Sequence, residues 1–365
     1  RYGMPEIWLS YGPTDVVLDV RAENLEKQIE SGGTNLSDSE IASKLESLDM
    51  SKPTEFVIME HSKTIQKIIS VLLDVYTKKS LPKPKFLVDK ANLNSIKNVF
   101  ADPTISISEF DTSQFSNANL VFIGEMEFDG LFGYNTISTK LLRRFGKDNM
   151  LEAYEKREGN LPLPGYELQT MQVAKKFTDG FEISTIEIVA SSTGIIDIAV
   201  GHPSSTFSLT KSLSSIAMHE IEKHRVVIVS TGKEASNETL SGSLSSIWNC
   251  SGAIKEEGLV ILLAECKNGL GSEAIQQYVE GRMSLDRLKN PSKYVDGMED
   301  LLFLTEMRKK FGIGIVSILP YLYTKDKLEL TPFSGAKESI DYILKTYGDR
   351  QKISIISDGS HTLLR

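Results

Sequence analysis

Two stretches of the chain place chemically useful residues directly after apolar, strand-like runs. One follows Phe56–Glu60, and the other lies in the turns after Val226–Ser230 and Leu259–Ala264. Ligands of parallel sheets bind beyond the carboxyl ends of the strands, and free N–H groups at a helix start favour anions. Small hydroxyl residues and glycines there also form ordinary strand-to-helix turns, so this alternative stays open. The predicted cofactor- or ligand-binding residues of these turns are Ser62, Lys63, Thr64, Gly232, Gly269, Gly271 and Ser272.

A loop rich in aromatic residues and glycine carries the candidate catalytic carboxylate, Asp129. Phe128, Phe132 and Tyr134 surround it in the sequence, which is typical of a cleft lining, although a plain loop position is the alternative. A basic run follows on a predicted helix that begins near Ser138. Such a run is usually a solvated face, but it can attract an anion if it faces a cleft. Its members are Lys140, Arg143, Arg144 and Lys147.

Histidine and cysteine give no pattern of metal ligands. The five histidines are scattered, with no His-x-x-x-His spacing, and the two cysteines, Cys250 and Cys266, fit neither a zinc motif nor a disulfide framework. His61 follows a predicted strand and reads as a capping or surface residue. His361 in the tail is uninformative. The sequence therefore predicts no metal site.

Strands alternate with helices along most of the chain, which predicts an α/β protein with two doubly wound domains, mainly parallel sheets and an interdomain cleft. A hairpin over residues 6–20 opens the chain, and residues 23–38 are expected to be a loop. We expect an N-terminal domain at 1–205, a helical connector at 206–225 and a C-terminal domain at 226–365. The prediction leaves open that the tail, residues 357–365, returns to the first domain.

The amino-acid composition excludes some classes of binding partner. The chain has 365 residues, a formal net charge of −8 and 40% hydrophobic residues. This acidic balance argues against nucleic acid, and no apolar run approaches the roughly 20 residues of a membrane helix. There is no signal-peptide pattern, so we expect a cytoplasmic protein that binds neither nucleic acid nor membrane.

Four segments resemble the nickel-pincer lactate racemase family. Ala-Glu-Cys-x-x-Gly-x-Gly after an apolar strand is the most specific motif among them. The four segments are Ile7–Leu25, Val189–Phe207, Val226–Gly232 and Gly258–Ala274. The resemblance implies a nickel-pincer nucleotide held between two α/β domains and racemisation of 2-hydroxy acids by hydride transfer. It also implies paired catalytic histidines, a lysine that links the cofactor, and a histidine on nickel.

Most of the residues that this chemistry requires are missing. The family's Asp-x-Thr-Arg loop falls on residues 62–65, where only Thr64 matches, and its Gly-Thr-His loop falls on residues 89–91. Asp129 stands where the later catalytic histidine is expected. Lys140 is a candidate for the linking lysine if one residue is inserted. The chain has no histidine between His61 and His202, so the nickel ligand has no counterpart. The family's glutamine and lysine of the second domain fall on Ser241 and Leu244.

Three functions are compatible with this pattern. The first is a non-racemase member that binds a small anionic ligand, a 2-hydroxy acid or a phosphate-bearing molecule, in the cleft. The second is a 2-hydroxy acid racemase or epimerase that uses the nickel cofactor with altered ligands. The third is a structural or interaction protein with a vestigial cleft.

Overall fold

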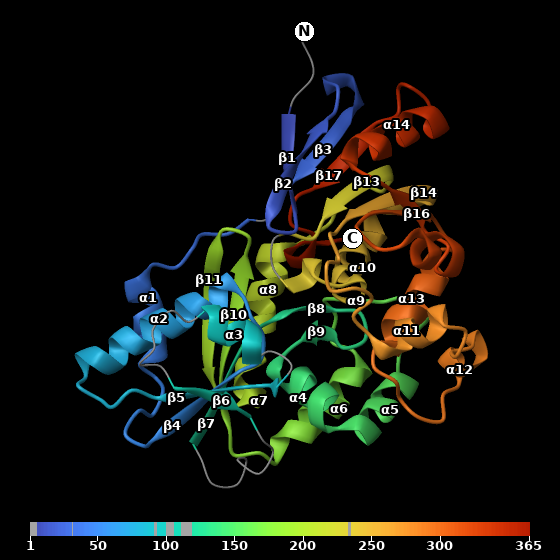
Figure 1. The fold of residues 1–365 in the computed structure, drawn as a ribbon. Helices are drawn as coiled ribbons and strands as arrows, with labels where there is room; N and C mark the ends of the chain where they lie inside the picture. Colours follow the sequence, from blue (N-terminus) through green and yellow to red (C-terminus); the bar gives the residue numbers. More distant parts are fainter. Residues whose placement is uncertain (1–5, 31, 91–92, 100–105, 111–118, 233–234) are drawn as a thin grey trace.

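The computed structural model describes residues 6–30, 32–90, 93–99, 106–110, 119–232 and 235–365. The chain is an α/β protein built around two six-stranded, largely parallel sheets, as predicted. In both sheets the inner strands are continuous apolar runs because helices or neighbouring segments cover both faces. Figure 1 shows the two sheets as separate layers, each with its own helices.

The first sheet has one antiparallel edge pair, β10 with β11, and is otherwise parallel. In sheet order its strands are β11 (Gly194–Gly201), β10 (Ser184–Ser191), β7 (Asn119–Glu125), β4 (Thr54–Ile58), β5 (Lys85–Val88) and β6 (Ile107–Glu109). The helices of this half are α1 (Asp38–Leu45), α2 (Lys63–Lys78), α3 (Leu93–Val99), α4 (Ile137–Phe145), α5 (Lys147–Glu155) and α6 (Gln169–Asp179).

The second sheet is parallel throughout. In sheet order its strands are β16 (Thr331–Phe333), β15 (Gly312–Val316), β14 (Ile254–Leu263), β13 (His224–Ser230), β17 (Ile353–Ile356) and β3 (Leu25–Ile29). Its helices are α9 (Leu240–Ser243), α10 (Ser245–Cys250), α11 (Glu273–Val279), α12 (Leu285–Lys289), α13 (Met298–Met307) and α14 (Ala336–Tyr347).

Residues 6–30 accompany the second sheet. The predicted hairpin is β1 (Glu6–Tyr11) with β2 (Thr14–Asp19). Its buried side chains, such as Leu9 and Leu18, share a core with Ile228 and Ile261 of the second sheet. The expected loop at 23–38 is wrong, since it contains β3, which pairs with β17 (Figure 1). Strand β3 was missed because its sequence is polar and only Ile29 of it is buried.

The connector also differs from its prediction. Instead of one continuous helical connector over 206–225, the chain forms α7 (Pro203–Thr206), α8 (Leu209–Ala217) and the short strand β12 (Met218–His219). Helix α8 ends there because β12 pairs with β18 (Leu363–Leu364) of the tail. No helix in the described part of the chain is long and apolar enough to cross a membrane.

Candidate functional site

Two adjoining cavities lie between the elements of the two sheets. The first, of about 370 Å³, is the acidic cavity, and the second, of about 470 Å³, is the α4 cavity. Glu60, Asn135, Arg143 and Asp296 line both, so the two are neighbouring chambers of one cleft. Carboxylates dominate the acidic cavity, and its positive partners are Arg143 and His361. The carboxyl side chains of its wall are Glu60, Glu125, Glu127, Asp129, Asp296, Glu299 and Asp300.

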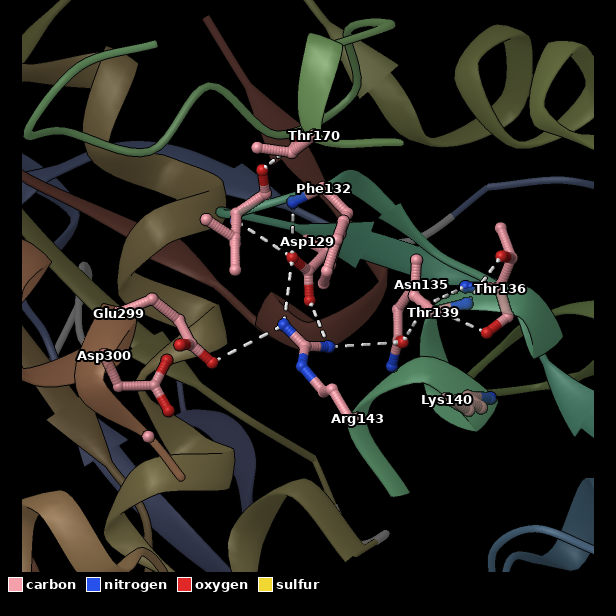
Figure 2. A network of polar contacts seen from close by, with 12 residues as sticks. Asp129, Phe132, Asn135, Thr136, Thr139, Lys140, Arg143, Thr170, Glu299 and Asp300 are labelled. Atoms are coloured by element: carbon pink, nitrogen blue, oxygen red, sulfur yellow. Dashed lines mark hydrogen bonds and ion pairs between the residues drawn. The ribbon is translucent and has the colours of Figure 1, made fainter. Parts of the chain in front are cut away.

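Asp129 lies in the short hairpin of β8 (Glu127–Asp129) and β9 (Gly133–Asn135). Its Oδ1 accepts hydrogen bonds from the backbone N–H groups of Leu131 and Phe132, at 2.9 and 2.8 Å. Its Oδ2 lies 3.0 Å from Nη1 of Arg143 (Figure 2). The carboxylate predicted to be catalytic therefore lines the acidic cavity, but it is already engaged in shaping the turn and holding an arginine.

Arg143 connects the two halves of the molecule. It comes from α4, and its Nη2 lies 3.6 Å from Oε1 of Glu299 on α13 (Figure 2). Burial alone would lower the pKa of Arg143, but Asp129 and Glu299 outweigh burial and raise the pKa, so the guanidinium is charged. This buried charge network fixes the wall that separates the two cavities.

Lys140, the candidate for the cofactor link, projects from α4 into an ion pair. Its Nζ donates to Oε1 of Glu60 at 2.8 Å and to the backbone oxygen of Glu125. Only 10% of its side chain is exposed. Burial opposes the charged form, yet Glu60 and Glu127 outweigh it and raise the pKa of Lys140 above its ordinary value. An ammonium held this way has no free electron pair, so it is a poor nucleophile.

Helix α4 begins at Ile137, next to the predicted start near Ser138. Thr136 caps it, with its hydroxyl accepting from the N–H of Thr139, while Ser138 is buried against Thr178. This register places the whole basic run at the cleft. Lys140, Arg143, Arg144 and Lys147 all line the α4 cavity. Arg144 makes two 2.8 Å hydrogen bonds to Asp89, a residue of the loop where the resemblance expects a histidine; Ala91 of that loop lies outside the described residues.

The Ser-Lys-Thr turn after β4 is split between two cavities. Ser62 lines the acidic cavity, where its Oγ accepts from the N–H of Ile65 and donates to Oε1 of Glu125 at 3.3 Å. Lys63 and Thr64 line a separate cavity of about 330 Å³ beside the β10–β11 turn. The structure therefore brings only Ser62 of this turn to the cleft.

The predicted residues in the glycine turns of the second sheet contact other parts of the chain. Gly232 bridges to Tyr11 of the hairpin, and Gly271 lies so close to Thr239 that a Cβ there would stand 2.4 Å from the threonine Cβ. The carbonyl of Gly269 accepts from the N–H of Leu240, and Ser272 caps α11 through the N–H of Ile275. None of these four predicted residues lines either chamber of the cleft.

The residues that the sequence did not single out are Glu125, Glu127 and the pair Asp358–His361. Strand β7 ends at Glu125 and β8 begins at Glu127, so the two carboxylates follow the central strand of the first sheet. His361 lies in a short 3-10 turn of the tail, with Nδ1 2.7 Å from Oδ1 of Asp358. The alternating glutamates after an apolar strand, and the Asp-x-x-His spacing, were the available signals.

Burial raises the pKa values of several carboxyl groups that line the acidic cavity. It raises the pKa of Glu125 and brings the pKa of Glu127 to about 7, with neighbouring carboxylates adding to the rise. It also raises the pKa of Glu299 to about 8 and of Asp300 to about 6. Burial alone would lower the pKa of His361, but the neighbouring carboxylate of Asp358 outweighs burial and raises the pKa of His361 to about 10. Groups that titrate near neutrality can accept or donate protons, or exchange their protons for a bound cation.

The nickel-pincer cofactor does not fit these residues. The histidines that line the acidic cavity among the described residues are His61 and His361, and the latter is bound to Asp358. None of the described residues that line the α4 cavity is a histidine, and Lys140 is held by Glu60. The donor set that the family's chemistry requires is therefore not assembled around Lys140.

The fold is that of lactate racemase. The lactate racemase apoprotein from Thermoanaerobacterium thermosaccharolyticum matches with a TM-score of 0.75 and 16% identity, over 99% of this chain and all of that one. A crystal structure of a Thermotoga maritima protein matches with a TM-score of 0.65 and 10% identity, over 92% of this chain and all of that one. No protein-family model and no curated protein sequence matches. At these identities the comparison shows the scaffold.

Proposed function

We propose that this protein binds a small anion, a 2-hydroxy acid or a phosphate-bearing molecule, in the α4 cavity and does not carry out nickel-pincer racemisation. The observation that carries the proposal is the placement of Lys140, Arg143, Arg144 and Lys147 around one chamber between the two sheets. Lactate racemase, the structural neighbour, acts on a 2-hydroxy acid, which gives the ligand class its starting point.

The two chambers differ in how they would receive an anion. Seven carboxyl side chains line the acidic cavity, against four carboxyl and four cationic side chains in the α4 cavity, so the α4 cavity repels an anion less. In the α4 cavity, Arg144 already presents its planar fork to a carboxylate, that of Asp89. Lys147 is exposed and has no ion-pair partner among the described residues. A ligand carboxylate or phosphate can therefore bind Lys147 and compete with Asp89 for Arg144.

The second function, an active racemase, is disfavoured by Lys140. Its ammonium is tied to Glu60, and the expected histidines are absent from the chamber that it lines. The third function, a vestigial cleft, is disfavoured because charged side chains line both chambers. A closed, apolar interface would be expected if the two halves only packed together.

Binding is tested by calorimetry with D-lactate, L-lactate and inorganic phosphate. We expect Arg144→Gln combined with Lys147→Gln to weaken binding by about tenfold or more, since hydrogen bonds to charged groups contribute about 1.5–3 kcal/mol. Lys156→Gln is the matched control, because Lys156 pairs with Glu152 on the surface and lines neither chamber. No binding of any of the three anions, or equal losses in both variants, would contradict the proposal.

Racemisation is tested separately, on protein co-expressed with the enzymes that make the cofactor. We expect an unmodified intact mass, no nickel by elemental analysis, and no conversion of L-lactate to D-lactate. A mass increase on Lys140 with stoichiometric nickel would instead establish the racemase alternative.

A further inference from the structure

Two glutamates and one histidine meet on the wall of the acidic cavity. Ligand atoms of Glu125, Glu127 and His361 all lie within 4.8 Å of one another. Glu125 is 6% exposed, Glu127 is half-buried, and the His361 side chain is 10% exposed. The glutamates come from the end of β7 and the start of β8, and the histidine comes from the tail. The fold therefore assembles this cluster from two distant parts of the chain.

The orientation of His361 is already fixed by a carboxylate. Asp358 is 2% exposed in its side chain, and its Oδ1 lies 2.7 Å from Nδ1 of His361. The other nitrogen, Nε2, has no hydrogen-bond partner in the described part of the chain. A histidine that binds a metal almost always donates its second ring N–H to a carboxylate or carbonyl in this way. The Asp358–His361 pair leaves Nε2 available for a ligand.

Glu127 is the second unsatisfied group of the cluster. Its side chain has no hydrogen bond or ion pair among the described residues, although Glu125 and Glu60 lie close enough to raise its pKa. Glu125 accepts a hydrogen bond from Ser62 at 3.3 Å, and the side chain of Thr64 also contacts its carboxylate. Carboxylates brought together at low exposure repel one another unless a proton or a cation lies between them.

We propose that Glu125, Glu127 and His361 bind a divalent transition-metal ion, with Asp358 orienting the histidine. This site goes beyond the anion-binding function and does not depend on it. Two carboxylate oxygens and one imidazole nitrogen form a mixed donor set that suits Mn²⁺ or Zn²⁺ better than Mg²⁺. Three protein ligands leave coordination positions open toward the acidic cavity, as in catalytic metal sites.

The competing interpretation is an internal ion pair. Protonated His361 can supply the positive charge itself, because its pKa is raised to about 10 by Asp358, with further contributions from Glu125 and Glu127. In that case the cluster would only bind the tail to β8. The two interpretations differ in whether a cation binds with measurable affinity and displaces protons.

The experiment uses the full chain after treatment with EDTA, titrated with Mn²⁺ and Zn²⁺ by calorimetry, with Mn²⁺ binding followed by electron paramagnetic resonance. We expect one ion per chain and weaker binding of Mg²⁺ by about tenfold or more. Glu127→Gln and His361→Gln should each weaken binding by about tenfold or more, while the exposed Glu46→Gln control leaves it unchanged.

Glu127→Gln also separates loss of the site from loss of the fold. It removes one of several repelling carboxylates, so the metal-free variant should melt at a higher temperature than the metal-free parent. The parent should gain melting temperature with Mn²⁺ and the variant should not. If the folded parent binds neither ion, or if Glu127→Gln and Glu46→Gln bind alike, the proposal is overturned and the internal ion pair is the correct interpretation.

Discussion

Two strand-to-helix turns in this molecule have the same local construction and different surroundings. Ser62 caps α2 by accepting from the N–H of Ile65 at 3.1 Å, and Ser272 caps α11 by accepting from the N–H of Ile275 at 3.3 Å. Ser62 also donates to Glu125 on the wall of the acidic cavity. Ser272 instead packs against the backbone of Gly297. A strand-turn-helix pattern therefore marks a candidate site only where the turn borders a cavity.

The loop before Ser272 shows how a glycine turn is closed off. The N–H groups of Leu240 and Ser241 donate to the carbonyls of Gly269 and Leu270, both at 3.0 Å. Gly271 contacts Thr239, the N-cap residue of α9. Glycine is required at this position because the chain has a φ of +80° and approaches a neighbouring helix closely. The turn thus joins two elements of the second half and does not reach the cleft.

The largest expected effect is a difference in stability between alanine variants at two glycines of this loop. Gly271→Ala would place a Cβ 2.4 Å from Thr239, and we expect it to lower the free energy of unfolding by about 3 kcal/mol or more. Gly269 has a similar φ of +86° but open space around its Cβ position, so Gly269→Ala should lower it by only about 1–2 kcal/mol. Urea unfolding of both variants measures the difference. Equal losses would mean that backbone conformation, and not packing, decides the role of the loop.

A smaller effect on stability comes from Glu299, which lines the acidic cavity. Because the pKa of Glu299 is raised from 4.5 to about 8, the folded state holds its proton more tightly than the unfolded state. The resulting stability is fully present below about pH 4.5 and is lost as the pH rises toward 8. Glu299→Gln, a neutral mimic, should reduce the fall in unfolding free energy between pH 5 and pH 8 by about 2 kcal/mol.

Urea titrations at both pH values, on the parent and on Glu299→Gln, measure this effect. Glu280→Gln is a suitable control, since Glu280 is exposed at the end of α11 and makes only local contacts with Gln276 and Arg282. An unchanged pH dependence in Glu299→Gln would show that Arg143 already keeps Glu299 ionised.

The smallest expected changes in stability are those of alanine variants at the two capping serines, Ser62 and Ser272. Ser62→Ala and Ser272→Ala should each lower the free energy of unfolding by about 1 kcal/mol, because each removes a helix cap. Of the two, Ser62→Ala alone should also weaken Mn²⁺ binding, by about tenfold, since Ser62 donates a hydrogen bond to Glu125 and Ser272 does not. Calorimetric titration of both variants measures this; a similar Mn²⁺ affinity in the two would show that the hydroxyl of Ser62 has no part in the cluster.

The sequence was informative where one local pattern determines the structure. Val226–Val229 and Leu259–Leu263 are apolar without interruption, which is typical of strands that are buried on both faces, and both belong to central strands of the second sheet. At Ser272 the alternative of an ordinary strand-to-helix turn, which its residue type and position allowed, is the one that the structure shows. Strand β3 could not be predicted this way, because an edge strand with three of its five side chains exposed has no apolar pattern.

The roles of the candidate site residues depend on tertiary contacts that the sequence does not contain. Asp129 lines the acidic cavity and Lys140 lines the α4 cavity, but their partners, Arg143 and Glu60, decide what they can do. His361 carries no local signal. Its position depends on the pairing of β18 with β12 and on the contact of the tail with β8, which no short-range pattern contains. The division of the chain at residues 205 and 226 remains a prediction.

The pairing of β3 with β17 has a consequence for folding and for dissecting the molecule. Their neighbours Ile29 and Ser357 are 328 residues apart in sequence, so this edge of the second sheet closes only across nearly the whole chain. Contacts of such long range slow folding, because the entropy of loop closure is lost before the contact forms. A fragment that begins at residue 206 would lack β3 and expose the backbone edge of β17. We expect such a fragment to aggregate through that edge, and addition of residues 6–30 in trans to suppress it.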